Sequence, residues 1–101
     1  MNEAAHWTVP ADHPALAGHF PGSPILPGVL LLDLALHEIS AATGIALEFC
    51  ELDPIKFLSP ARPGDALMIR HQLMANGTIR FEIVSGLRKI AGGSIVPGSG
   101  V

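Results

Sequence analysis

Three residues within one short stretch of this chain have the types and spacing needed to move protons beside a carbonyl group. They are His19 in a segment rich in Pro and Gly, Gly28 at the expected start of an apolar helix, and Asp33 in the first two turns of that helix. A neutral imidazole accepts protons near neutral pH, N–H groups at a helix start stabilise an oxyanion, and a buried acid can donate a proton. The stretch therefore predicts an enzyme that uses general acid–base chemistry.

Each of these residues has a predicted role. His19 is the candidate base, because the prolines near it restrict the backbone and would hold the ring in a fixed direction. Asp33 is the candidate acid, because desolvation among leucines would raise its pKa and keep part of it protonated. The N–H of Gly28, at the positive end of the helix dipole, is placed to receive the oxyanion. This chemistry needs no metal and no organic cofactor.

Structural roles compete with some of these interpretations. His37 lies one turn after Asp33 on the same helix face, and it could either contact a polar part of the substrate or support Asp33. His19 could instead cap backbone groups, and Asp33 could form a salt bridge or a cap. Trp7 and Phe20 are candidates to line a tunnel for an acyl chain, although packing in the core also explains them.

The apolar helix should run from Pro27 to about Thr43, with Gly44 as its C-terminal stop. It has hardly any polar arc, so we expect protein to surround it. The predicted strands cover residues 5–9, 47–57 with a break near Asp53-Pro54, 67–73, 79–83 and 90–96.

Two glycine pairs add detail to these strands. Asn76-Gly77 predicts a type I′ hairpin between the third and fourth strands. Gly92-Gly93, inside the last strand, predicts a bulge or a close backbone approach. Pro63-Gly64-Asp65 predicts a turn that sets strand register.

One helix and a mainly antiparallel, curved sheet of about five strands give an α+β fold class. With 101 residues, the chain should form a single domain over residues 1–101, of which 97–101 would be a flexible tail. Such a sheet leaves its edges exposed, so we expect pairing with a second copy of the chain, at least as a dimer.

The composition argues against several other classes of protein. The net charge is −3 and the six Lys and Arg form no continuous block, which disfavours nucleic-acid binding. The apolar run at 25–36 is too short and too interrupted to span a membrane, and the start of the chain lacks a secretory pattern, so a cytoplasmic location is expected. Cys50 is the only cysteine, and no spacing of His6, His13 and His71 supports zinc.

The basic residues are unevenly distributed along the chain. Residues 1–55 contain no Lys or Arg, and all six follow, at Lys56, Arg62, Arg70, Arg80, Arg88 and Lys89. Such asymmetry can prepare one edge of a domain for an acidic partner.

Residues 19–33, HFPGSPILPGVLLLD, and residues 57–67, FLSPARPGDAL, each carry a recognisable pattern. Together they resemble the 3-hydroxyacyl-(acyl-carrier-protein) dehydratases of the FabA/FabZ group, including short members of aryl-polyene-type pathways. The resemblance spans roughly residues 7–96. It implies a hotdog fold in which the histidine of one subunit, here His19, works with the carboxylate of the other, here Asp33. It also implies Gly28 as the oxyanion donor and an acyl carrier protein as the partner.

The resemblance implies the reversible dehydration of carrier-bound 3-hydroxyacyl thioesters to trans-2-enoyl thioesters. Asp33 follows the FabA kind, where many FabZ relatives carry Glu, and His37 replaces an amide often found in the family. Two alternatives remain open. One is another hotdog thioester enzyme, either a hydratase on coenzyme A thioesters or a thioesterase. The other is a non-catalytic acyl-binding subunit that dimerises with an active relative.

Overall fold

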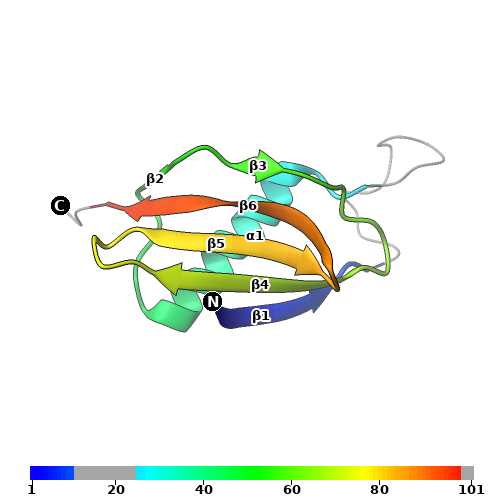
Figure 1. Ribbon diagram of the computed structural model, residues 1–101, viewed down its shortest axis with the longest axis horizontal. Helices are drawn as coiled ribbons and strands as arrows, with labels where there is room; N and C mark the ends of the chain where they lie inside the picture. Colours follow the sequence, from blue (N-terminus) through cyan, green and yellow to red (C-terminus); the bar gives the residue numbers. More distant parts are fainter. Residues whose placement is uncertain (11–24, 99–101) are drawn as a thin grey trace.

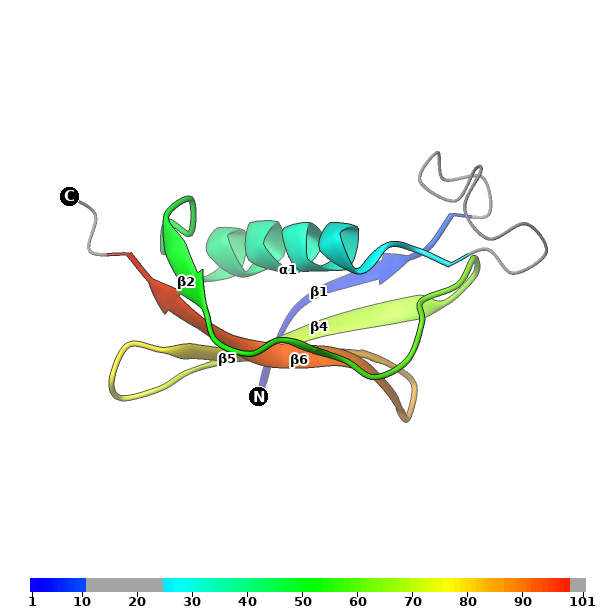
Figure 2. The same cartoon turned by 90° about the horizontal axis from the view of Figure 1, so that it is seen from above.

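Helix α1 lies across one face of a six-stranded sheet in the computed structural model, which describes residues 1–10 and 25–98 (Figures 1 and 2). The elements are β1 (Asn2–Thr8), α1 (Gly28–Thr43), β2 (Cys50–Leu52), β3 (Lys56–Phe57), β4 (Ala66–Leu73), β5 (Ile79–Ser85) and β6 (Arg88–Pro97). The sheet order is β1-β4-β5-β6-β2, β3 also pairs with β6, and all these pairings are antiparallel. The predicted α+β fold class is confirmed.

The strand predicted over residues 47–57 is present only in part, as two short strands, β2 and β3, and residues 47–49 belong to no strand. The break falls at Asp53-Pro54, as predicted, because proline has no N–H to donate to the ladder. Both strands pair with β6, with Cys50 opposite Pro97 and Lys56 opposite Gly92. The sheet therefore has six strands where about five were expected, and Pro97 belongs to β6 although it was predicted to begin a tail.

The core lies between α1 and the inner face of the sheet. Leu31, Ala35 and Ile39 are spaced four residues apart, so they form one stripe along α1, and all three are buried. Alternate residues of β4 and β5 supply the facing layer, namely Leu67, Ile69, His71, Ile79, Phe81 and Ile83. The alternation predicted for these two strands is confirmed, except that Leu73 at the end of β4 is 54% exposed.

The sheet covers only one side of α1, so the prediction that protein surrounds this helix is wrong for the single chain. Val29 is 72% exposed, and Asp33 and His37 are also exposed. By helical periodicity these three residues lie opposite the buried stripe. Figure 2 shows α1 resting on the sheet, with none of the described strands over its far side.

The C-terminal end of α1 lies where the sequence predicts it, and the start lies one residue later than predicted, because Pro27 is the N-cap and not the first helical residue. The helix begins directly after Pro27 and ends at Thr43. Gly44 then adopts the left-handed conformation, with φ of 74°, and its N–H donates to the carbonyl of Ser40 at 2.9 Å. Glycine adopts this conformation without a Cβ clash, which is why it ends the helix here.

The β4–β5 hairpin is present, but its turn is not the predicted type I′. The N–H of Gly77 donates to the carbonyl of Met74 at 2.9 Å, and the N–H of Met74 donates to the carbonyl of Thr78 at 2.8 Å. Residues 75–77 therefore form a three-residue loop, with Gly77 at φ of 88°. A turn closed by one left-handed glycine is a common hairpin geometry, and it needs positive φ at one position where type I′ needs two.

Gly92 and Gly93 permit a close approach of the chain, as predicted. A Cβ on Gly93 would overlap the side chain of Ile55 and lie 3.3 Å from the carbonyl oxygen of Pro54. A Cβ on Gly92 would lie 3.3 Å from the carbonyl oxygen of Phe81. Glycine at position 93 therefore lets the segment before β3 pack onto β6, and glycine at position 92 leaves room for the backbone of β5.

Candidate active site

The structure describes three of the five predicted site residues, because His19 and Phe20 lie outside the described residues. Gly28 is the first residue of α1, Asp33 lies in its second turn, and His37 follows one turn later. Asp33 and His37 are exposed, and Gly28 is half-buried. These three residues and their surroundings form the described part of the site.

The start of α1 lies against the ring of Phe57. A Cβ on Gly28 would be 2.8 Å from Cε1 of Phe57, so only glycine admits the ring in this position. The carbonyl of Pro27 accepts hydrogen bonds from the N–H groups of Leu30, at 3.1 Å, and Leu31, at 3.3 Å. The N–H of Gly28 lies at the first position of the helix, where an N–H group has no partner within the helix. An oxyanion donor requires such an unpaired N–H group.

A hollow of about 230 Å³ opens beside this helix start. Its walls are mostly apolar and consist of Ile25, Leu26, Gly28, Leu31, Phe57, Leu58, Ser59, Pro60 and Ala61. Arg88 holds one wall in place, because its Nη1 donates to the hydroxyl of Ser59 and to the carbonyl of Pro60, both at 2.7 Å. A mostly apolar hollow that ends at a helix N-terminus suits an apolar ligand with a carbonyl group.

The same arginine also fixes the turn before β4. Nη2 of Arg88 donates to Oδ2 of Asp65 at 2.7 Å, and the N–H of Arg62 donates to the same oxygen at 2.8 Å. Partial burial alone would raise the pKa of Asp65, but the hydrogen bonds from Arg62 and Arg88 and the charges of both arginines outweigh it and lower the pKa below its ordinary value of 3.8. The turn that was predicted to set strand register is therefore tied to β6.

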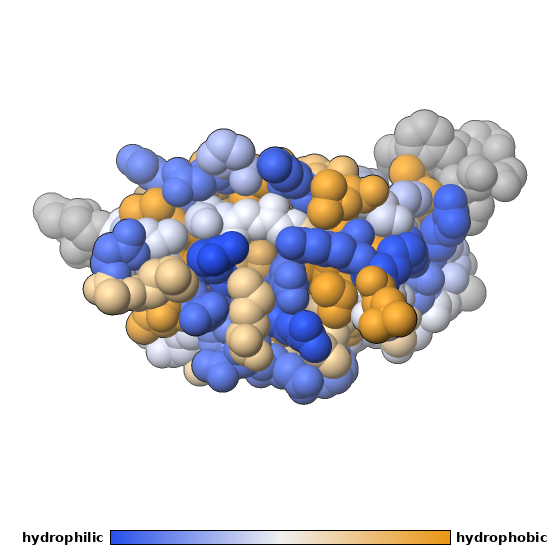
Figure 3. Space-filling model, viewed as in Figure 1, coloured by the Kyte–Doolittle hydropathy of each residue, from blue (hydrophilic) through white to orange (hydrophobic). Residues whose placement is uncertain are grey.

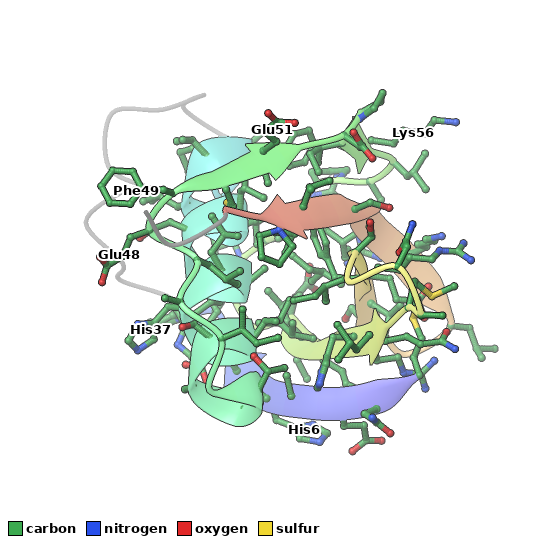
Figure 4. All side chains as sticks on the ribbon, turned by 90° about the vertical axis from the view of Figure 1, so that its left-hand side faces the viewer. His6, His37, Glu48, Phe49, Glu51 and Lys56 are labelled. Carbon is green, nitrogen blue, oxygen red and sulfur yellow. The ribbon has the colours of Figure 1, made fainter. Side chains whose placement is uncertain are left out.

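A larger hollow of about 380 Å³ lies on the exposed side of α1, and we call it the α1 hollow. It is lined by Asp33, Leu36, His37, Ser40, Leu47 and Glu48. Figure 4 shows His37 and Glu48 projecting on the same side of the molecule, one from α1 and the other from the segment that follows the helix. The structure thus brings Asp33 and His37 to one hollow, as their spacing predicted.

Gly28 and Asp33 line different hollows in the single chain. Five residues of helix separate them by about 7.5 Å along the axis and rotate them by about 140° about it. The expected burial of Asp33 among leucines is also wrong for the single chain, because its stripe of α1 faces away from the sheet. A second layer of protein over this stripe is needed to remove the carboxyl group from water.

Two polar residues of the α1 hollow were not predicted. Ser40 is seven residues after Asp33, which is a helical spacing, so the pattern that pointed to His37 could have indicated it as well. Glu48 lies in the irregular segment after Gly44, and no spacing rule connects it with Asp33. Its place in the wall depends on how this segment folds back along the helix.

The other residues considered in the sequence analysis, Trp7, His71 and Cys50, lie in the core or beside it. Trp7 is half-buried and packs against the core, which favours the packing interpretation. His71 was expected at the surface or the core edge, yet it is only 7% exposed, and its Nδ1 has no hydrogen-bond partner among the described residues. Cys50 is a half-buried free thiol at the start of β2.

Within residues 1–10 and 25–98, no helix combines the length and the apolar character that crossing a membrane requires.

Four of the six basic residues lie on the outer face of the sheet, away from α1, and we call this set the basic face. They are Lys56, Arg70, Arg80 and Lys89, on strands β3 to β6. Glu82 lies among them, 3.3 Å from Nη1 of Arg70 and 3.6 Å from Nζ of Lys89. Carboxylates also border this face, because Glu3 is paired with Arg70 and Glu51 with Val96 in the sheet. Among the described residues, Lys56 and Arg80 are the two cations of the face that form no ion pair.

A shallow depression of about 230 Å³ lies on this face. Its lining includes Lys56, Arg80 and Lys89, together with the backbone of Gly92 and Gly93. Figure 3 views the molecule from this side and shows hydrophilic side chains across the middle of the sheet. Four of the six Lys and Arg residues therefore lie on the side of the sheet away from α1.

Known proteins match this chain in sequence. A family model described as ApeI-like, ApeI dehydratase, matches residues 2–94. The chain is 35% identical over 74 residues to the 3-hydroxyacyl-[acyl-carrier-protein] dehydratase FabZ of Syntrophobacter fumaroxidans, and the match covers 65% of this chain and 50% of that protein. The chain therefore spans about half the length of the curated relatives it matches.

Solved structures match it in fold. The dehydratase heterocomplex ApeI:P from Xenorhabdus doucetiae superposes with a TM-score of 0.78 at 23% identity, covering 90% of this chain and 81% of that chain. A mutant form of the fluoroacetyl-CoA-specific thioesterase FlK superposes with a TM-score of 0.63 at 15% identity, covering 90% of this chain and 82% of that chain. These likenesses confirm the hotdog fold that the sequence predicted.

Proposed function

Because the chain belongs to the ApeI-like dehydratase family, we propose that it dehydrates 3-hydroxyacyl thioesters to trans-2-enoyl thioesters. The observation that carries this proposal is the position of Asp33, which lines a hollow of ligand size on the uncovered side of α1. An exposed carboxyl group in the middle of an apolar helix has no packing role there, whereas an acid beside a hollow can act on a bound molecule.

The reaction needs a base, an oxyanion donor and an acid. His19 takes a proton from C2 of the substrate, and the electron pair of that C–H bond becomes the new C2–C3 double bond. The N–H of Gly28 stabilises the negative charge that develops on the thioester oxygen. Asp33 gives a proton to the hydroxyl on C3 as the C3–O bond breaks, so that the oxygen leaves as water.

A second copy of the chain would complete the site and bury Asp33. Large apolar side chains are exposed at the start of α1 and along the β2–β3 edge, namely Val29, Phe49, Leu52, Phe57 and Leu58. An edge of this kind is suited to pairing, and a homodimer would cover it. His19 of one subunit would then meet Asp33 of the other, as the family resemblance implies.

The proposed substrate is carried by an acyl carrier protein. The basic face supports this assignment, because Lys56 and Arg80, which form no ion pair among the described residues, can attract an acidic protein by charge complementarity. The thioester would reach the site from that partner. Gly28 of one subunit would contact its carbonyl oxygen, and Asp33 of the other subunit would contact the hydroxyl on C3. The cytoplasmic location stays a prediction from the sequence.

The test follows enoyl formation from a 3-hydroxyacyl thioester, both on acyl carrier protein and as a small thioester mimic. The wild-type chain should form the enoyl product, and His19→Ala and Asp33→Asn should each lower kcat by about 10²- to 10⁴-fold. Glu3→Gln is the matched control, because Glu3 is exposed on β1, at the opposite edge of the sheet, and it should retain the wild-type rate on the small mimic.

Other outcomes would identify the alternatives. Enoyl formation that persists in both His19→Ala and Asp33→Asn would contradict the assigned roles. Thiol release without enoyl product would show a thioesterase. Activity that arises only after mixing with an active relative would show a non-catalytic subunit.

A further inference from the structure

We propose that the α1 hollow holds the far end of the acyl chain and selects chains that carry a hydrogen-bond donor there, such as a hydroxyl or an amine. His37, Ser40 and Glu48 are the specificity-determining residues. The inference rests on the proposed function, because it takes Asp33 as the acid beside C3 of the substrate. The inference goes further by naming the kind of acyl chain that is preferred, because dehydration at C2 and C3 puts no requirement on the far end of the chain.

The direction of the hollow sets where the acyl chain runs. From Asp33 its lining continues along α1 to His37 and Ser40, toward the C-terminal end of the helix. His37 lies about 6 Å beyond Asp33 along the axis, and Ser40 lies about 10 Å beyond it. An extended carbon chain with bonds of about 1.5 Å advances about 1.3 Å per bond, so a group five or six bonds beyond C3 reaches His37.

The walls of the hollow are too polar for a plain alkyl end. Only Leu36 and Leu47 are apolar, and the other four lining residues carry a carboxyl, imidazole or hydroxyl group. An alkyl chain would displace water from these groups and return no hydrogen bond, which costs free energy. A chain end that makes hydrogen bonds avoids this loss.

The chemistry of the walls specifies a donor. The hydroxyl of Ser40 already donates to the carbonyl of Ile45 at 2.7 Å, so toward a ligand it can only accept. A carboxylate such as that of Glu48 accepts hydrogen bonds, and the ring of His37 can donate or accept. Hydrogen-bond acceptors therefore dominate the walls of the α1 hollow. The carboxylate of Glu48 would also repel an anionic chain end.

The test compares two acyl groups that differ in one terminal group. The 3,8-dihydroxyoctanoyl and 3-hydroxynonanoyl thioesters carry a hydroxyl and a methyl at the same position, and a third thioester ends in a carboxylate. Their kcat/KM values are measured for the full chain. Saturated analogues without the 3-hydroxyl measure binding alone by calorimetry.

Three variants accompany the wild-type chain in this test. His37→Leu removes the hydrogen-bonding ring, His37→Gln keeps hydrogen bonding, and His6→Leu is the matched control on the outer face of the sheet.

The wild-type chain should prefer the hydroxyl-ended group over the methyl-ended one by at least about tenfold in kcat/KM and in Kd, and should disfavour the carboxylate. His37→Leu should reduce this preference to less than about twofold, whereas His37→Gln and His6→Leu should keep most of it.

Equal binding of the two analogues by the wild-type chain, a preference unchanged in His37→Leu, or no detectable binding of either analogue would overturn the inference. If neither thioester is dehydrated but the binding preference and its loss in His37→Leu are present, the proposed function fails and the inference stands.

Discussion

Arg88 and Asp65 form an ion pair of 2.7 Å that joins the first residue of β6 to the turn before β4. Their side chains are 37% and 22% exposed, so water screens part of the attraction. Arg88 also holds Ser59 and Pro60, which line the hollow at the start of α1. One guanidinium therefore connects strand register with a wall of the candidate site.

Asp65→Asn should destabilise the fold in a pH-dependent way. The folded-state pKa of Asp65 is lowered, so its contribution is complete above the ordinary value of 3.8 and is lost as the pH falls through the lowered value. At neutral pH the variant should lose about 1 kcal/mol of unfolding free energy, and the difference from wild type should close in acid. Urea unfolding at neutral pH and at steps below 3.8 measures this, with Asp53→Asn as the control. A difference that stays constant with pH would contradict the assigned ion pair.

Gly28→Ala should destabilise the chain by about 1 kcal/mol, because its Cβ would meet the ring of Phe57 at 2.8 Å. In a Phe57→Ala background the same change should be neutral or slightly stabilising, since alanine favours helix more than glycine does. A double-mutant cycle by chemical unfolding gives the interaction energy, expected at about 1 kcal/mol. Additive effects of the two changes would show that the ring does not limit this position.

His71→Leu should raise the unfolding free energy by about 1 kcal/mol, because it removes a buried Nδ1 that has no partner among the described residues. His6→Leu serves as the control, since His6 lies on the exposed outer face and should change stability by less than about 0.5 kcal/mol. Thermal unfolding of the two variants beside wild type gives the comparison. Marked destabilisation by His71→Leu would indicate that the ring has a hydrogen-bonding role in the core.

Phe49→Glu should weaken the proposed dimer. Phe49 is 83% exposed beside β2, and a charge there would have to be desolvated when two edges pair. Leu87→Glu is the matched control, because Leu87 is fully exposed in the turn between β5 and β6. Sedimentation velocity over a range of concentrations should show a monomer for Phe49→Glu and a dimer for Leu87→Glu and wild type. A dimer of unchanged strength in Phe49→Glu would place the interface elsewhere.

Arg80→Glu should lower kcat/KM for a carrier-bound substrate by about tenfold, because it replaces a cation of the basic face with an anion. The same variant should act on a small thioester mimic at the wild-type rate. Arg62→Glu, at an exposed position off the basic face, controls for net charge. Added salt should reduce the gap between wild type and Arg80→Glu. Equal losses of kcat/KM on both substrates would mean that Arg80 stabilises the fold and does not bind the carrier protein.

The elements of the fold could be predicted because their signals are local. Proline before and glycine after the apolar run define both ends of α1, and alternating apolar residues define β4 and β5. The type of the β4–β5 turn could not be predicted, because Asn76-Gly77 is compatible with both a two-residue and a three-residue loop. Which one forms depends on how the whole length of the two strands pairs.

The candidate site could be predicted only in part. Helical periodicity places Asp33 and His37 on one face, but it does not show which side of an apolar helix the sheet covers. Glu48 enters the wall through the path of an irregular segment, which no periodicity describes. The burial expected for Asp33 depends on a second layer over α1, and a pattern within one chain carries no information on that layer.

Lys56 and Phe57 are neighbours on β3, so one peptide unit separates a cation on the outer face from the ring beside Gly28. A slip of β3 by one residue would exchange the two, placing an ammonium group at the positive end of the α1 dipole and an aromatic ring among the cations. Ile55, directly before β3, packs against the core in the space that Gly93 leaves open. The same slip would move this side chain out of that space, so one contact opposes a pairing error that would reverse the polarity of both surfaces.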